Sequence, residues 1–189
     1  YLIRDEKNPV SSNDFGKDII PTMLKDGMKM VAHRFCGYWK DVGTIESLWE
    51  AHMDLLDEKP QIDLNDPGWR IYSRIPDQPP KYIAEGAIVN SSLVGDGCEI
   101  YGSVNRSVLF YGSSVGEGSV VQDAVIMPNV KIGKNVIIHK AIIDAGTVIG
   151  DGCVIGTMKT EHDKITLVGS NQKIDSEVRR SFFQGRMNA

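Results

Sequence analysis

The sequence predicts a mainly β protein whose C-terminal part is a single-stranded left-handed β-helix, preceded by a short α/β segment. Two observations predict this fold. Aliphatic residues recur every 17 positions, at Val115, Ile132 and Ile149. Each period also divides into hexapeptide-like steps of six, five and six residues, and each step opens with an aliphatic residue. Three such steps make one triangular coil, and each coil buries its interior only by stacking on the next.

Small residues at the fifth place of each step are expected to fill the rest of the narrow interior. They are Ser119, Val125, Val130, Val136, Ile142, Thr147 and Cys153. A glycine follows Val115, Ile132 and Ile149, where it permits a corner conformation that a β-carbon would penalise. The interval from Val94 to Val115 is 21 residues. This predicts four extra residues that bulge outward near residues 100–104.

Composition divides the chain into four segments. Residues 57–82 are rich in proline and poor in periodic apolar residues, which is typical of an extended linker. Residues 1–56 precede the linker and lack the coil pattern, whereas residues 83–168 carry it. Residues 169–189 are expected to be a cap or a tail, because the last coil needs a cover for its open edge.

Two helices and two strands are predicted in the first segment. Asn13 or Asp14 caps a helix over residues 15–24, and Thr44 caps an amphipathic helix over residues 45–56. Apolar and polar residues alternate over residues 28–35, which predicts a strand. Tyr1 to Arg4 resembles the end of another strand, so the chain is expected to be part of a longer protein.

Charge and composition exclude several functional classes. The net charge is −4 and the basic residues are scattered, so no nucleic-acid partner is expected. No apolar run approaches the roughly 20 residues that cross a bilayer, and no signal segment is present, so we expect a cytoplasmic protein. The spacing of Cys36, Cys98 and Cys153 matches no metal-ligand pattern, which favours reduced packing residues.

Two places in the chain could carry chemistry. His139 follows an inward-facing position and is the natural general base if the coils form an acyltransferase, although no other site residue clusters near it. The run from Gly37 to Thr44 is richer: Trp39 could stack on a sugar ring and Asp41 could hold a divalent cation. A tight turn before a capped helix explains the same run more simply, and spacing alone does not establish a binding site.

Longer motifs favour a binding site over a simple turn in the run from Gly37 to Thr44. Residues 12–21, Ser-Asn-Asp-Phe-Gly-Lys-Asp-Ile-Ile-Pro, and residues 37–51, Gly-Tyr-Trp-Lys-Asp-Val-Gly-Thr-Ile-Glu-Ser-Leu-Trp-Glu-Ala, closely resemble the ADP-glucose pyrophosphorylases, or glucose-1-phosphate adenylyltransferases. The similarity continues in the coils at residues 100–102, 107–110 and 125–128, and it covers nearly the whole chain except the last dozen residues.

The resemblance implies a bacterial enzyme that makes ADP-glucose and pyrophosphate from ATP and glucose 1-phosphate for glycogen synthesis. It also implies a Rossmann-like nucleotidyltransferase domain before the β-helix, Mg²⁺ as cofactor, and an allosteric homo- or hetero-tetramer assembled through the β-helix. Carried over by position, Asp41 corresponds to a catalytic, Mg²⁺-binding carboxylate. Asp14, Phe15 and Trp39 correspond to residues that line the glucose 1-phosphate pocket.

Several alternatives remain beside this interpretation. The family's glycine-rich loop, first metal carboxylate and sugar-phosphate lysine would precede Tyr1, so the 189-residue chain alone is expected to release no pyrophosphate in a coupled assay. A regulatory paralogue shares the β-helix but tends to lose the carboxylates, whereas Asp41 is present. A hexapeptide acyltransferase and a structural and regulatory module complete the set. Outward apolar residues at Phe110, Val120 and Ile137 suit side-by-side assembly.

Overall fold

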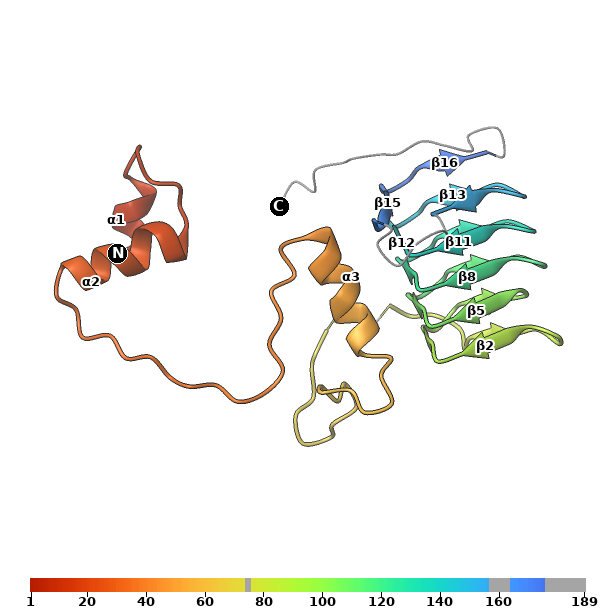
Figure 1. Cartoon of the computed structure of the whole chain (residues 1–189), viewed down its shortest axis with the longest axis horizontal. Helices are drawn as coiled ribbons and strands as arrows, with labels where there is room; N and C mark the ends of the chain where they lie inside the picture. The colour runs from red at the N-terminus through yellow and green to blue at the C-terminus, as the bar shows by residue number, and fades with distance from the viewer. Residues whose placement is uncertain (74–75, 157–163, 176–189) are drawn as a thin grey trace. The chain divides into compact units, whose positions relative to one another are not determined.

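The first unit of the chain is helical. The computed structural model describes residues 1–73, 76–156 and 164–175, and the chain divides into the units Tyr1–Gly37 and Tyr38–Ala189 (Figure 1). The helices of the first unit are α1 (Leu2–Glu6), the π-helical turn η1 (Phe15–Ile19) and α2 (Ile20–Lys25). Pro21 lies in the first turn of α2, and Gly27 follows this helix with φ of +72°. The predicted helix is therefore confirmed, with a wider first turn.

Both strands predicted in the first segment are wrong. Residues 2–6 form α1 instead, and residues 28–35 form neither helix nor strand. Most side chains of residues 28–35 are exposed, including Val31 at 83%. A strand needs a neighbour to take up its backbone hydrogen bonds, and no other described segment pairs with residues 28–35. Alternation alone did not reveal that missing partner.

The second unit contains one helix and a stack of short strands (Figure 1). The helix is α3 (Ile45–Asp54). The strands are β1 (Tyr82–Ile83), β2 (Ile88–Asn90), β3 (Leu93–Val94), β4 (Glu99–Ile100), β5 (Ser103–Asn105), β6 (Val108–Leu109), β7 (Ser114–Val115), β8 (Val120–Gln122), β9 (Val125–Ile126), β10 (Lys131–Ile132), β11 (Ile137–His139), β12 (Ala141–Ile143), β13 (Val148–Ile149), β14 (Val154–Ile155), β15 (Thr166–Val168) and β16 (Lys173–Ile174).

These strands form three parallel sheets, one for each side of a triangular β-helix. The first sheet has the order β1-β4-β7-β10-β13-β16. The second has the order β14-β11-β8-β5-β2, and the third β15-β12-β9-β6-β3. Successive strands along the chain enter different sheets, so every coil pairs with the coils before and after it. This arrangement confirms the predicted fold class, and the stack continues past residue 168 to β16, which pairs with β13.

The length of one coil differs from the prediction. Ile100 pairs with Ile83, 17 residues earlier, and with Val115, only 15 residues later. The coil that begins at Ile100 is therefore shortened by two residues, and residues 100–104 do not bulge. The predicted insertion compared Val94 with Val115, but these residues lie in the third and first sheets. Tyr101 and Gly102 alone connect β4 to β5, and a β-carbon at Gly102 would collide with the carbonyl oxygen of Ser119.

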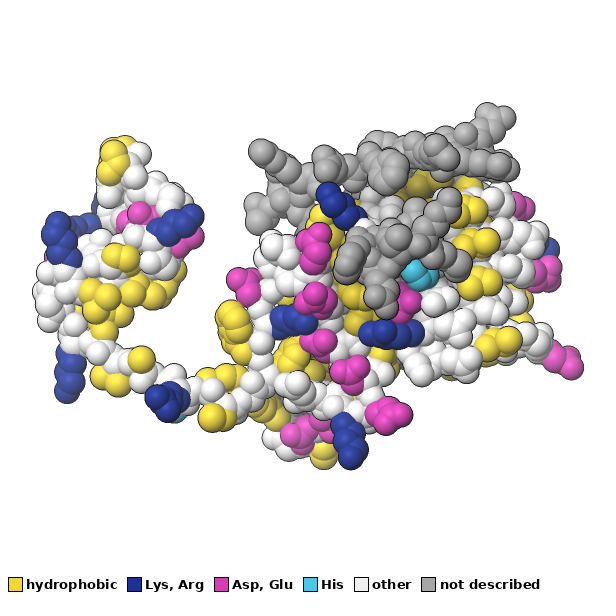
Figure 2. All heavy atoms as spheres, in the orientation of Figure 1, with side chains coloured by type: hydrophobic (Ala, Val, Ile, Leu, Met, Phe, Trp, Pro, Cys, Tyr) yellow, Lys and Arg dark blue, Asp and Glu magenta, His cyan; other side chains and the backbone are white. Residues whose placement is uncertain are grey.

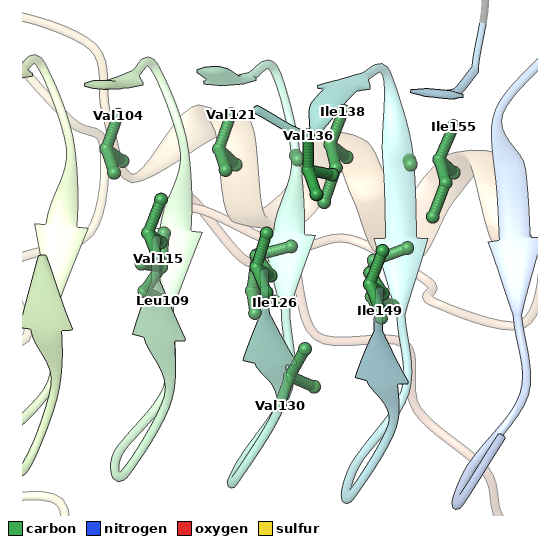
Figure 3. Close-up of a cluster of buried hydrophobic side chains, with 14 of the residues drawn as sticks. Val104, Leu109, Val115, Val121, Ile126, Val130, Val136, Ile138, Ile149 and Ile155 are labelled. Atoms are coloured by element: carbon green, nitrogen blue, oxygen red, sulfur yellow. The ribbon is translucent and has the colours of Figure 1, made fainter. Parts of the chain in front are cut away.

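The interior of the stack is a continuous column of aliphatic side chains. Val104, Val121, Ile138 and Ile155 follow one another along the stack (Figure 3), and the first three are fully buried. Small residues fill the remaining space, as predicted, at Ser119, Val130, Val136, Thr147 and Cys153. The prediction is wrong for Val125 and Ile142. Ala124 and Ala141 take the interior place in these five-residue steps, and Val125 and Ile142 point toward α3 instead.

Helix α3 packs on the outer face of the third sheet. Its side chain Met53 is 3% exposed and belongs to a cluster with Val108, Val125 and Ile142, against which Leu48 and Trp49 also pack. The indole Nε1–H of Trp49 donates to the Asp123 carbonyl at 2.7 Å. The amphipathic helix predicted over residues 45–56 therefore forms as Ile45–Asp54, and its apolar face packs against the β-helix. No described helix is long and apolar enough to span a membrane.

Candidate functional site

The segment between Gly37 and α3 carries two of the predicted site residues, Trp39 and Asp41. Its end is fixed by the cap of α3: Thr44 Oγ1 accepts from the Ser47 N–H at 3.1 Å, and Ser47 Oγ accepts from the Thr44 N–H at 3.1 Å. This reciprocal pair satisfies two backbone donors of the first turn. The segment therefore enters the helix at a defined position, and Thr44 is the predicted cap.

Tyr38 and Lys40 anchor the same segment to α3. The Tyr38 hydroxyl donates to Asp54 Oδ2 at 2.9 Å, and Lys40 Nζ donates to the same oxygen at 2.9 Å. Lys40 Nζ also lies 3.2 Å from Glu50 Oε2. Figure 2 shows basic and acidic side chains interspersed over this region. The hydrogen bond from Lys40 holds the pKa of Asp54 below its ordinary value, and the same bond raises the pKa of Lys40.

Trp39 and Asp41 alternate with these anchors and are exposed. The Trp39 side chain is 75% exposed, and Asp41 Oδ1 accepts from the Gly43 N–H at 3.0 Å. That contact orients the Asp41 carboxylate and leaves it at the surface. Mg²⁺ bound to substrate phosphates needs only one or two protein carboxylates, so Asp41 fits such an ion. No group of three or more potential metal ligands gathers among the described residues, at Asp41 or at any other place.

Asp14 and Phe15 belong to the other unit. Asp14 caps η1, with Oδ1 accepting from the Lys17 N–H at 2.8 Å, and Phe15 is 58% exposed. The Asp18 carboxylate holds the preceding turn, because its Oδ2 accepts from the Ser12 hydroxyl at 2.6 Å and from the Asp14 N–H at 3.1 Å. The structure thus places each pair of predicted residues, Asp14 with Phe15 and Trp39 with Asp41, within its own unit.

The remaining candidates are His139 and the three cysteines. His139 Nε2 lies 3.6 Å from Asp123 Oδ2, and its side chain is 18% exposed. All three cysteines are free, as predicted. Cys98 and Cys153 are buried and burial raises the pKa of both thiols, which makes them unreactive. Cys36 is exposed, so the expected packing role is wrong for this residue.

Sequence reasoning missed Asp54, which accepts from both anchors of the Trp39–Asp41 segment. Two signals could have indicated it. Tyr38 and Lys40 alternate with the candidate site residues, and Glu50 and Asp54 stand four positions apart on one face of the predicted helix. Neither signal shows that Asp54 is the partner, because it lies 14 residues from Lys40 and 16 residues from Tyr38 in the sequence. The contact is therefore seen only in the structure.

The Asp54 contacts predict a pH dependence of stability. The folded pKa of Asp54 lies below its unfolded value of about 4, so the stability due to its carboxylate is present above that value and is lost as pH falls through the folded pKa. We expect Asp54→Asn to lower the melting temperature at pH 6 and to converge with the unaltered chain below about pH 4. Thermal unfolding followed by circular dichroism between pH 3 and 7 checks this, and a constant difference across that range contradicts it.

Comparisons with known proteins agree with the two parts of the chain. Residues 79–175 match the family model described as GlmU-like, C-terminal hexapeptide, and residues 1–58 match the model for nucleotidyl transferases. Glucose-1-phosphate adenylyltransferase from Desulforamulus reducens is 58% identical over 129 residues, which cover 68% of this chain and 32% of the relative. The enzymes of the same name from Bacillus mycoides and Bacillus cereus are 58% identical over 128 residues, 34% of their length.

These matches confirm the resemblance to the glucose-1-phosphate adenylyltransferases that the motifs indicated. The chain spans about a third of the length of these relatives. The hexapeptide model alone covers half of the chain, and its matched range includes every strand of the observed stack. The chain therefore belongs to the GlmU-like hexapeptide-repeat family, with a nucleotidyl transferase segment before its β-helix.

Proposed function

We propose that the chain serves a glucose-1-phosphate adenylyltransferase, which joins ATP and glucose 1-phosphate to give ADP-glucose and pyrophosphate in the cytoplasm for glycogen synthesis. The 58% identity to enzymes of that name carries the proposal. The exposed pair Trp39 and Asp41, on a segment anchored to α3, supports it. In the reaction, a phosphate oxygen of glucose 1-phosphate forms a bond to the α-phosphorus of ATP, and the bond from that phosphorus to the pyrophosphate oxygen breaks.

Each candidate residue has a role suited to its chemistry. Asp41 presents an oriented carboxylate that would hold Mg²⁺, which neutralises phosphate charge when bound. The exposed indole of Trp39 and the ring of Phe15 offer apolar faces to the sugar. Asp14 can accept from sugar hydroxyls through the oxygen that does not cap η1, since Oδ1 receives the Lys17 N–H. The resemblance of each motif supports these roles for its own residues. The nucleophile is a phosphate oxygen of glucose 1-phosphate, so no described side chain needs to act as one.

An assay of pyrophosphate release on the complete polypeptide that carries these residues tests the proposal. We expect turnover only when ATP, glucose 1-phosphate and Mg²⁺ are all present, with ADP-glucose as the sugar product. A polypeptide that makes no ADP-glucose alone but changes the rate of a separate catalytic subunit is the regulatory paralogue. Transfer of an acyl group instead indicates the hexapeptide acyltransferase, which has less support because the relatives 58% identical to the chain are named glucose-1-phosphate adenylyltransferases.

We also propose that the β-helix assembles subunits, as a tetramer that responds to an allosteric effector. Support comes from a row of outward apolar residues in register on the second sheet, Val120, Ile137 and Val154. Ile88 extends this row beyond Ser103, the polar residue that separates it from Val120. Ile88 and Val154 are half exposed, and Figure 2 shows apolar side chains over this sheet. Phe110, expected to join this surface, packs under α3 instead, edge to face with His52 at 5.8 Å.

A charge placed in this row is expected to disrupt assembly. Ile137→Glu puts a carboxylate at the centre of the row. Burying this unpaired charge between subunits costs far more free energy than the apolar contact of one side chain contributes. Light scattering should show a smaller particle for Ile137→Glu, with the circular dichroism of the folded β-helix retained. Val148→Glu is the matched control, because Val148 is 42% exposed on the first sheet. Equal effects of both substitutions contradict the assignment of this sheet.

A further inference from the structure

In the segment from Tyr38 to Asp41, alternate residues hold the backbone against α3. Tyr38 and Lys40 reach α3, each 2.9 Å from Asp54 Oδ2. Trp39 and Asp41, the intervening residues, are exposed. The contacts to α3 therefore fix the backbone on either side of Trp39 and immediately before Asp41. The two side chains assigned to sugar phosphate and metal extend from a segment whose anchors meet at a single carboxylate oxygen.

Asp54 itself has a fixed place on the β-helix. It is the last residue of α3, directly after Met53, which is 3% exposed against the third sheet. One turn earlier, Trp49 donates to the Asp123 carbonyl, and Lys140 Nζ lies 5.7 Å from the centre of the Trp49 ring. A chain of direct contacts thus runs from the coils of the β-helix through α3 to the Trp39–Asp41 segment.

Asp54 is the stronger of the two acidic partners of Lys40. Its side chain is 35% exposed and accepts from two donors, whereas the Glu50 side chain is 55% exposed and contacts Lys40 alone at 3.2 Å. Hydrogen bonds to a charged acceptor are stronger than neutral ones, and they weaken with exposure to solvent. Loss of Asp54 would release both anchors together. Loss of Glu50 would leave both in place.

We propose that Asp54 is a positioning residue, which holds Trp39 and Asp41 at the place set by α3 and the β-helix. This inference rests on the proposed function, in which Asp41 binds Mg²⁺ and Trp39 faces the sugar phosphate. Through these contacts the β-helix determines where the metal carboxylate lies. A change in the position of α3 on the third sheet would then be transmitted directly to the Trp39–Asp41 segment.

The kinetic test compares Asp54→Ala with Glu50→Ala in the complete enzyme. We expect Asp54→Ala to raise both the KM for glucose 1-phosphate and the Mg²⁺ concentration at half-maximal rate by about tenfold, because a misplaced carboxylate and indole bind poorly. Glu50→Ala should change both by less than about twofold, and Asp54→Asn, which keeps an acceptor oxygen, should recover part of the loss. Equal effects of the two alanine variants, or a lower kcat with both constants unchanged, would overturn the proposal.

A second measurement on the 189-residue chain does not depend on activity. Trypsin must bind the side chain of Lys40 before it cleaves after this residue, and Asp54 and Glu50 hold that side chain. We expect Asp54→Ala to raise cleavage after Lys40, relative to cleavage after the exposed Lys29, by about tenfold, because the local opening that exposes Lys40 becomes easier. Glu50→Ala should leave this ratio within about twofold. Mass spectrometry of the fragments gives it.

The two measurements separate the inference from the function on which it rests. An unchanged cleavage ratio in Asp54→Ala overturns the positioning role and leaves the proposed function intact. A raised ratio in the 189-residue chain, together with no turnover of ATP and glucose 1-phosphate by the complete enzyme, instead refutes the proposed function, and with it the assignment of Asp54 to this reaction.

Discussion

Asp41→Asn is expected to lower the rate of ADP-glucose formation by the complete enzyme about 100-fold or more at saturating substrates, because a metal ion contributes several kcal/mol of charge stabilisation in the transition state. Asparagine has the same shape and can still accept from the Gly43 N–H through its amide oxygen. The segment therefore keeps its turn, and only the negative charge is lost. Pyrophosphate release measured over a range of Mg²⁺ concentrations checks this, and high Mg²⁺ should restore part of the rate.

Asp66→Asn provides a matched control for that substitution. Asp66 Oδ1 accepts from the Gly68 N–H at 2.7 Å, in the same turn geometry as Asp41 with Gly43, and it lies in the proline-rich segment before the β-helix. It should keep the rate within about twofold, since exposed substitutions away from a site have small effects. Comparable losses in both variants, or full activity in Asp41→Asn, would remove Asp41 from the role of metal ligand.

The β-helix could be predicted from sequence because its physical requirement repeats. Each coil needs an inward aliphatic residue in every sheet, so Val121, Ile138 and Ile155 recur 17 positions apart and pair in register. One coil of irregular length does not obscure a pattern that the other coils repeat. The shortened coil between Ile100 and Val115 was missed because the count along the chain does not show which sheet a residue enters.

The first unit shows the opposite case. Capping by Asp14 is local, so its helix could be predicted within a few residues. Pairing of a strand is not local, and the alternation in residues 28–35 carried no information on whether a neighbour exists. The candidate site likewise has a local part, which could be predicted, and a long-range part, which could not. Trp39 and Asp41 stand in one short motif, whereas the docking of α3 joins Trp49 to Asp123 across 74 positions of sequence.

Met53→Ala is expected to destabilise the packing of α3 on the third sheet by about 2–5 kcal/mol, the usual cost of truncating a buried methionine to alanine. Met53 is 3% exposed among Val108, Val125 and Ile142, and the β-strands beneath it are too well paired to close the cavity. The transition measured by guanidinium unfolding with tryptophan fluorescence should shift to lower denaturant, while circular dichroism of the coils changes less. Trp49 dominates the change in fluorescence because it packs against the third sheet, whereas Trp39 and Trp69 are exposed.

Met28→Ala is the matched control for this change, because Met28 is 47% exposed in the first unit and the same atoms are removed. It should shift unfolding by no more than about 0.5 kcal/mol. Met53→Ala should also raise tryptic cleavage after Lys40, because undocking of α3 moves Asp54, which holds that lysine. If Met53→Ala lowers stability but leaves Lys40 as protected as before, the Trp39–Asp41 segment is held by α3 alone, and the β-helix does not set its position.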